Sequence, residues 1–98
     1  MSNAPLSVRH EESGNRGAFV IDEGGRELAR MTYVRAGEQR FIIDHTEVSD
    51  ELRGRGAGLA MVQAAVDWAR KTGRKVTATC PFAKATLEKH PEFNDVMA

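Results

Sequence analysis

The sequence predicts an α+β fold in which an antiparallel meander of strands is followed by a strand–helix–strand unit. The first half of the chain alternates apolar and polar residues with a period of two and carries tight turn signals. The second half changes to a helical period over residues 58–72 and then returns to a short β-branched run. A strand, helix and strand in succession favour one parallel pair beside the antiparallel strands. We therefore expect a mixed sheet with two helices.

Four strands are expected before the long helix, at residues 8–12, 17–22, 27–35 and 40–48. Glycine-containing segments at 23–26 and 36–39 separate the last three strands, and glycine supplies the positive φ that tight turns need. The consecutive apolar residues Phe41, Ile42 and Ile43 indicate that the fourth strand is central and covered on both sides.

The long helix is expected to end before Gly73, which suits a left-handed helix stop. Its core-facing positions recur at helical spacing at Leu59, Val62, Ala65, Val66 and Ala69. A fifth strand over 75–80 is closed by Pro81, because proline has no N–H for the ladder. A second, short helix is expected over 83–89.

Length and composition limit the function classes. The 98 residues fit a single domain over 1–98, with a disordered N-terminus over 1–6. Fourteen basic residues balance 14 acidic ones, which disfavours a nucleic-acid partner. No apolar run approaches the roughly 18 residues of a membrane span, and the N-terminus does not have the pattern of a signal peptide. A single cysteine favours a reducing, cytoplasmic setting. We expect a monomer or a weak homodimer.

The segment between the fourth strand and the long helix has the features of an anion site. It contains Gly54, Gly56 and Gly58, interleaved with Arg53 and Arg55. No Ser, Thr, Asp or Asn stands immediately before the helix, so its first N–H groups have no side-chain cap. Free donors at the positive end of the helix dipole attract anions, and glycine lets the backbone approach a phosphate closely. The alternative interpretation is a flexible glycine loop with a tight helix entry.

Two other phosphate-binding motifs do not fit this segment. The Rossmann fingerprint needs Gly-x-Gly-x-x-Gly and an acidic residue near the end of the next strand. Here the glycines are spaced Gly54-x-Gly56-x-Gly58, and residues 75–80 contain no Asp or Glu. The Gly-Lys-Ser/Thr of a P-loop does not occur.

Arg53-x-x-Gly56-x-Gly58 between a central strand and a helix resembles the acyl-CoA pyrophosphate motif of the GNAT N-acetyltransferases. An ordered set of segments extends the resemblance over residues 16–96, to a small YjdJ-type subgroup of that family. The segments are Ile43-Asp44-His45-Thr46-Glu47-Val48, Leu52-Arg53-Gly54-Arg55-Gly56, Trp68-Ala69-Arg70, Cys80-Pro81-Phe82-Ala83-Lys84 and His90-Pro91-Glu92-Phe93.

The resemblance implies transfer of an acetyl group from acetyl-CoA to a primary amine of a small molecule or protein. It implies a minimal GNAT-like sheet that opens between the fourth and fifth strands, with the pantetheine arm of coenzyme A in the opening. By the same analogy, backbone groups near Val48 contact the arm. The loop of Arg53, Gly54, Arg55, Gly56, Ala57 and Gly58 binds the pyrophosphate. Relative to typical members, the sequence lacks the segments that build the acceptor pocket and a tyrosine acid near the second helix.

Lys84 and Lys89 are candidates for the adenosine phosphates, with ordinary solvated lysines as the alternative. Acetyl transfer also needs a base for the proton of the amine. His45 and Glu47 lie two residues apart on a strand and so share a face, at the mouth of the expected opening. Either is a candidate base, and a hydrogen-bonded polar strand end is the alternative.

Cys80 is the candidate nucleophile or proton donor. It precedes Pro81, which fits the first position of the second helix, so Cys80 stands at an N-cap where the helix dipole lowers a thiol pKa. The alternative is a small residue that lines the opening. The three histidines and Cys80 do not have metal-ligand spacing, so no metal is expected. Two other function classes stay open: a coenzyme A-binding module with little or no catalysis, and an interaction domain whose loop binds another anion.

Overall fold

A computed structural model describes residues 6–98 and has the α+β architecture that the sequence predicts. Leu6 packs against the core, whereas the rest of the expected disordered N-terminus, residues 1–5, lies outside the described residues. The strands are β1 (Val8–Ser13), β2 (Arg16–Glu23), β3 (Arg26–Arg35), β4 (Arg40–Val48) and β5 (Lys75–Ala78). The helices are α1 (Ala57–Thr72) and α2 (Pro81–Lys89), with 3₁₀ segments at Asp50–Leu52 and Pro91–Val96.

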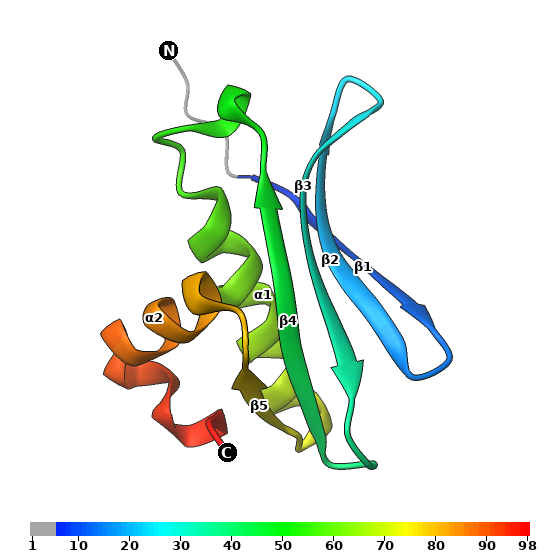
Figure 1. Ribbon diagram of the computed structural model, residues 1–98, viewed down its shortest axis with the longest axis vertical. Coiled ribbons are helices and arrows are strands. Elements are labelled where there is room, and N and C mark those ends of the chain that lie inside the picture. The colour runs from blue at the N-terminus through cyan, green and yellow to red at the C-terminus, as the bar shows by residue number, and fades with distance from the viewer. Residues whose placement is uncertain (1–5) are drawn as a thin grey trace.

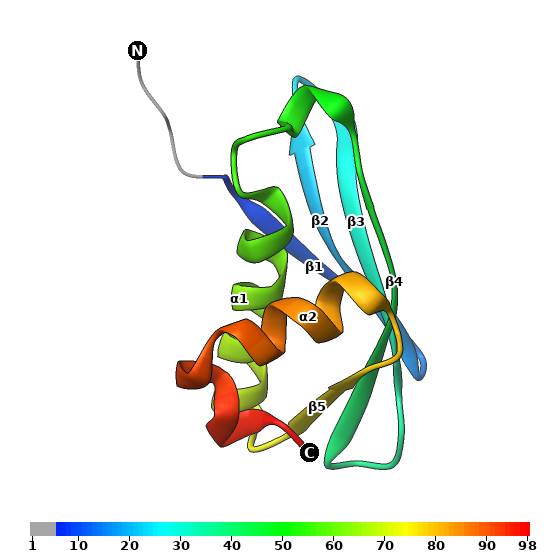
Figure 2. The same ribbon diagram turned by 60° about the vertical axis from the view of Figure 1, so that its left-hand side comes forward.

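One sheet holds the five strands in the order β1-β2-β3-β4-β5 (Figure 1). Strands β1 to β4 pair antiparallel in chain order, and β5 joins β4 in parallel. The predicted meander with one parallel addition is therefore confirmed. Helix α1 connects the two parallel strands, and both α1 and α2 lie on the same side of β2, β3 and β4 (Figure 2).

A β-bulge interrupts the pairing of β3 with β4. Tyr33 lies opposite Ile43, but Thr32, the residue before Tyr33 in β3, lies opposite His45. Asp44 is therefore the extra residue on β4.

The bulge decides which residues of β4 face the helices. Directly opposed residues of an antiparallel pair share a face of the sheet. Thr46 lies opposite Met31, and Val48 lies opposite Ala29; both of these β3 residues are buried in the core. If β4 had paired regularly, with Asp44 opposite Thr32, the period of two would have placed His45 and Glu47 on the core face together with Ile43.

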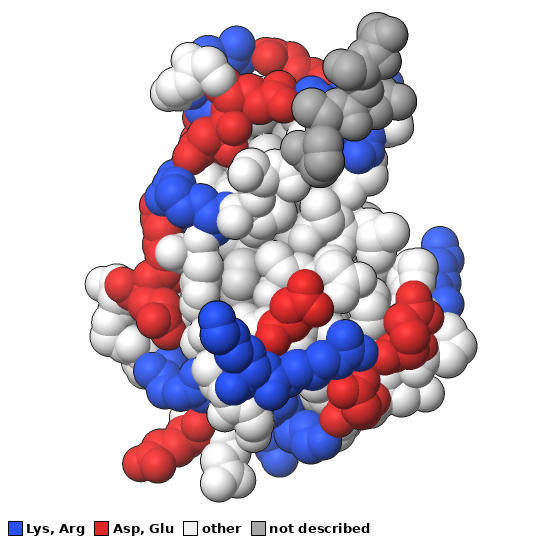
Figure 3. Space-filling view, turned by 180° about the vertical axis from the view of Figure 1, so that it is seen from behind, with Lys and Arg blue, Asp and Glu red and all other residues white. Residues whose placement is uncertain are grey.

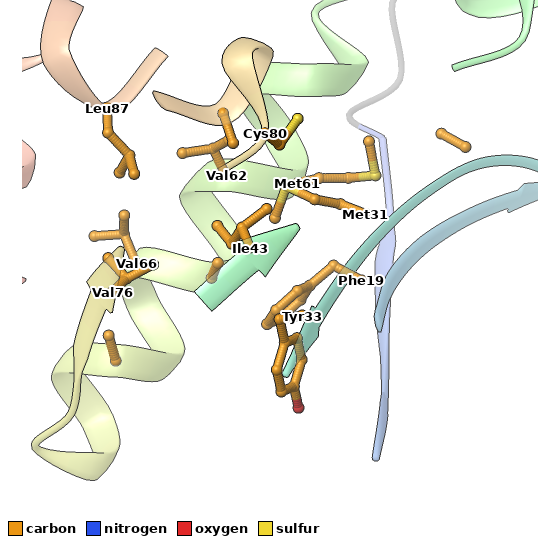
Figure 4. Close-up of a cluster of buried hydrophobic side chains, with 14 of the residues drawn as sticks. Phe19, Met31, Tyr33, Ile43, Met61, Val62, Val66, Val76, Cys80 and Leu87 are labelled. Atoms are coloured by element: carbon orange, nitrogen blue, oxygen red, sulfur yellow. The ribbon is translucent and has the colours of Figure 1, made fainter. Parts of the chain in front are cut away.

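The core lies between α1 and the sheet. In Figure 4, Met61 and Val62 of α1 lie close to Met31 and Ile43 of the sheet, and all four side chains are fully buried. Burying one such side chain stabilises the fold by about 1.5–3 kcal/mol relative to leaving it exposed. This packing fixes the position of α1 on the sheet.

Helix α1 buries a different arc of its surface from the predicted one. It begins at Ala57, one residue earlier than expected, and its buried positions are Ala57, Met61, Val62, Ala65, Val66 and Ala69. Leu59, predicted to face the core, is 40% exposed. At about 100° of rotation per residue, Leu59 falls at the edge of this arc.

Strand β5 ends at Ala78, two residues before the predicted end, because its pairing with β4 ends at Ile43. The N–H groups of Thr79 and Cys80 both donate to the carbonyl of Ile43, at 2.9 and 3.3 Å. The bulge at Asp44 follows directly, so β4 continues without a β5 partner. We call the opening between β4 beyond Ile43 and the chain beyond Ala78 the fork.

Helix α2 begins at Pro81, the position that the fixed φ of proline predicted as its first, and therefore two residues before the expected range of 83–89. The 3₁₀ segment Pro91–Val96 was not predicted. After it, the Ala98 N–H donates to the carbonyl of Val76 at 3.1 Å, so the C-terminal residues pair with the outer edge of β5.

Charged side chains of both signs lie next to one another on the face that Figure 1 hides. Figure 3 shows this face, with uncharged side chains in its middle and Lys, Arg, Asp and Glu around them. This distribution matches the balance of 14 basic and 14 acidic residues. Among the described residues, no helix is long and apolar enough to cross a membrane.

Candidate functional site

A groove of about 410 Å³ lies at the N-terminal end of α1. The end of β4, the glycine loop and the first turn of α1 form one wall, and α2 forms the other. The first wall contains Val48, Leu52, Gly54, Gly56, Ala57, Gly58 and Leu59, and the second contains Phe82, Thr86, Lys89 and His90. Five of the residues predicted to bind coenzyme A therefore line one groove.

The start of α1 leaves its backbone donors free. Gly56 is the N-cap and provides no side-chain hydrogen bond, as predicted. The first helical hydrogen bond runs from the Ala60 N–H to the Gly56 carbonyl, at 2.9 Å. Within residues 6–98, the N–H groups of Ala57, Gly58 and Leu59 have no partner. All three residues line the groove, so the positive end of the helix dipole opens into it.

The loop glycines are needed for two different reasons. Gly54 and Gly56 have φ of 77° and 73°, in the left-handed region, and a Cβ on either would meet nothing within 4 Å. Their role is thus backbone conformation. Gly58 has an ordinary φ, but a Cβ there would collide with the Phe82 ring. The two walls of the groove therefore lie in close contact at Gly58 and Phe82.

Both loop arginines have carboxylate partners within the chain. Arg55 donates two hydrogen bonds to Glu23, at 3.0 and 2.8 Å, and these lower the pKa of the Glu23 carboxyl. Arg53 pairs with Asp50 at 2.9 Å. Neither of these two arginines lines the groove. Arg55 instead ties the β2–β3 turn to the glycine loop.

The two lysines of α2 lie beside different cavities. Lys89 lines the groove, whereas Lys84 lines a separate cavity of about 190 Å³ with Leu87 and Met97. Phe82, Thr86 and Lys89 recur at i, i+4 and i+7 and so share one face of α2. The structure thus brings Lys89, and not Lys84, to the predicted phosphate region.

Cys80 lies at the fork as the N-cap of α2, as predicted. The thiol is buried, with 7% of the residue exposed, and its Sγ lies 3.3 Å from the Thr46 hydroxyl. Desolvation raises the pKa of the Cys80 thiol, but the Thr46 hydroxyl and the N–H groups of Ala83 and Phe82 at the start of α2 outweigh it and lower that pKa overall.

His45 and Glu47 lie on the other face of the sheet. They oppose Thr32 and Arg30, and their side chains are 61% and 72% exposed. His45 Nε2 lies 3.1 Å from the Glu47 carboxylate. The expected pair on one face is present, but the bulge turns it away from the helices and places Thr46 and Val48 on the helix side instead.

Phe82 and Thr46 are among the residues of this region that were not predicted from the sequence. Phe82, 45% exposed, reaches Gly58 across the groove. Its spacing to Thr86 and Lys89 was the available signal. Thr46 had no such signal, because its orientation depends on the bulge at Asp44.

Residues 18–96 match the family described as GCN5-related N-acetyl-transferase. The chain belongs to this family. Acetyl transfer is the chemistry for which the family is named, and the predicted resemblance to GNAT N-acetyltransferases is confirmed at this level.

Relatives of known sequence or structure agree with this assignment. Protein NATD1 of Xenopus tropicalis is 29% identical over 86 residues, which cover 87% of this chain and 79% of that protein. A GCN5-like protein from Staphylococcus aureus, solved by NMR, is similar with a TM-score of 0.71 and 36% identity, covering 97% and 90% of the two chains.

The fold also extends to a more distant enzyme. The ribosomal-protein-alanine N-acetyltransferase of Brucella melitensis is similar with a TM-score of 0.62 at 16% identity, covering 89% of this chain and 66% of that one.

Within residues 6–98, no group of three or more His, Cys, Asp or Glu side chains could hold a metal ion.

Proposed function

We propose that this member of the family transfers an acetyl group from acetyl-CoA to a primary amine, with Cys80 as the group that carries the acetyl. The observation that supports it best is the row of free N–H groups at Ala57, Gly58 and Leu59, which opens into a groove that ends beside the fork. The ordered set of segments around Cys80 and His90 also favours the small YjdJ-type subgroup.

The N-terminal end of α1 fits the pyrophosphate of coenzyme A. Free backbone donors at the positive end of a helix dipole bind phosphate oxygens without a charged side chain. Lys89 and His90 line the opposite wall and are suited to a further phosphate. Arg55 adds no free donor, because its backbone N–H donates to the Leu52 carbonyl at 3.0 Å and its guanidinium group is paired with Glu23.

The apolar part of the groove fits the pantetheine arm. Val48 and Leu59 are both about 40% exposed, and with Phe82 they give the groove an apolar lining between the glycine loop and the fork. Thr46 lies two strand residues from Val48 on the same face, a separation of roughly 7 Å. An arm bound along this lining would therefore bring its thioester to Thr46 and Cys80.

Cys80 would act as a nucleophile. Its thiolate Sγ attacks the thioester carbonyl carbon, the bond from that carbon to the sulfur of coenzyme A breaks, and coenzyme A leaves as a thiolate. An amine then attacks acetyl-Cys80, the carbon–Sγ bond breaks, and the thiolate is regenerated. A base accepts the proton that the amine loses.

The outer face of the sheet is the side from which we expect the amine to approach. The fork separates β4 from β5 at the level of Thr46, and His45 and Glu47 flank Thr46 on that outer face. Glu47, 72% exposed, is the candidate base, with His45 beside it at 3.1 Å. The amine would thus reach acetyl-Cys80 through the fork.

The test begins with acetyl-CoA and no acceptor. We expect an added acetyl mass on the peptide that contains Cys80, labile to hydroxylamine, and parallel double-reciprocal kinetics once an amine is supplied. Cys80→Ala should lose the adduct and most of the turnover while it still binds coenzyme A. Full turnover by Cys80→Ala with intersecting kinetics would instead support direct attack by the amine on the bound thioester.

Binding measurements separate the other function classes. Calorimetry should show a higher affinity for coenzyme A than for ADP, because ADP lacks the pantetheine arm. Coenzyme A binding with no acetyl transfer to any of a panel of amines and peptides would leave a binding module. Equal affinity for ADP and coenzyme A would contradict the assigned arm site.

A further inference from the structure

We infer that Thr46 is a positioning residue that holds the Cys80 thiol in its reactive, deprotonated form. This rests on the proposed function, because it assigns a partner to the group that would carry the acetyl. The role comes from the fold, since the two residues are 34 positions apart in the chain and meet across the fork.

The bulge on β4 places the Thr46 hydroxyl on the helix side of the sheet. Thr46 opposes Met31, which is fully buried in the core beneath α1. Its Oγ lies 3.3 Å from Cys80 Sγ. If β4 paired with β3 without the bulge, Asp44 would lie opposite Thr32, and the period of two would turn Thr46 to the outer face and leave Cys80 without this partner.

The Thr46 hydroxyl of β4 is the hydrogen-bond partner of Cys80 Sγ. The N–H groups of Phe82 and Ala83, in the first turn of α2, also lower the pKa of the thiol, although no side-chain capping hydrogen bond forms there. A hydroxyl can accept from a thiol or donate to a thiolate, whereas a methyl group can do neither. Because Cys80 is only 7% exposed, water cannot readily replace a lost donor.

The Thr46 hydroxyl opposes two other influences on the pKa of the Cys80 thiol. Desolvation and the carboxylate of Asp44 both raise the pKa of the thiol, and Thr46 is the largest of the groups that lower it. Asp44 is in turn held by Thr32, at 2.6 Å, and by Arg16, at 3.5 Å.

The test measures the rate of Cys80 alkylation by iodoacetamide as a function of pH, in the intact protein without ligand. Thr46→Val keeps the branched shape and removes the hydroxyl, whereas Thr46→Ser keeps the hydroxyl. A hydrogen bond to a charged group is strong, so its loss in Thr46→Val should slow alkylation at neutral pH about tenfold or more. The midpoint of the alkylation rate against pH should move up by about one pH unit or more. Ser should restore most of the rate.

Thr79→Val is the matched control, because Thr79 precedes Cys80 directly but is exposed. It should leave the midpoint at the wild-type value. Coenzyme A affinity should stay near wild type in all three variants, which reports that the groove is intact. If Thr46→Val fails to fold, Thr46→Ala serves in its place.

An unchanged midpoint in a folded Thr46→Val or Thr46→Ala protein would overturn the inference. So would a shift of the same size in Thr79→Val. The readout is independent of acetyl transfer. A shifted midpoint in a protein that forms no acetyl-Cys80 supports the role of Thr46 and contradicts the proposed function. An acetyl adduct with an unchanged midpoint does the reverse.

Discussion

Replacing Gly56 by alanine tests the anion site at the start of α1. Gly56 has φ of 73° and ψ of 28°, and its Cβ would meet no atom within 4 Å. The cost of the substitution is therefore backbone strain alone, about 1–2 kcal/mol for an L-residue in the left-handed region. To relieve it, residue 56 must leave this conformation and move the N–H groups of Ala57 and Gly58. We expect coenzyme A binding to weaken at least tenfold, about 1.4 kcal/mol.

Gly73 at the other end of the same helix provides the control. It caps α1 with φ of 70° and ψ of 28°, and its Cβ would likewise meet nothing within 4 Å. Gly73→Ala should cost the same strain, and each variant should lower the melting temperature by about 4–8 °C per kcal/mol. Only Gly56→Ala should weaken coenzyme A binding, because Gly73 does not line the groove.

Calorimetric titration with coenzyme A and thermal unfolding of the three proteins give the answer. Equal affinity in Gly56→Ala, Gly73→Ala and wild type, with both variants folded, would refute the pyrophosphate site. Equal weakening in both variants would attribute the effect to lost helix stability instead.

Three further outcomes are expected. Lys89→Ala should weaken coenzyme A binding several-fold in low salt, about 1 kcal/mol or less for one exposed charge, whereas Lys84→Ala should not; the reverse order by calorimetry would contradict the proposed phosphate wall. Glu47→Gln should lower turnover by roughly 10²–10⁴ with acetyl-CoA affinity unchanged, and an unchanged rate would clear Glu47 as the base. Desolvation lowers the pKa of His10, whose Nε2 lies 2.6 Å from the Tyr33 hydroxyl. The unfolded chain therefore binds the proton more readily, and the free energy of unfolding should fall as pH drops below about 6.5. His10→Gln, which keeps an acceptor for Tyr33, should flatten that slope in urea titrations, and an unaltered slope would assign it to other groups.

Local patterns in the sequence were sufficient for the order of elements. The helical spacing from Val62 to Ala69 and Gly73 as a helix stop both report interactions within a few residues. The glycines and the missing side-chain cap at the start of α1 could also be predicted, because the residue at the N-cap is a property of the local sequence. The fold class and the position of the anion site followed from these features.

Cross-strand register decided which side chains enter the site. A single extra residue at Asp44 turns His45 and Glu47 to the outer face and brings Thr46 to Cys80. No local pattern encodes that residue, since a bulge arises from how β4 pairs with β3. One added residue moves every later side chain of the strand to the opposite face of the sheet. The rotation of α2, which sends Lys89 and not Lys84 to the groove, is likewise set by packing against α1 and β5. The sequence by itself thus determined the elements and the loop that we propose as the anion site. The tertiary structure alone decided which groups lie at the fork, because facing direction depends on contacts between residues far apart in the chain.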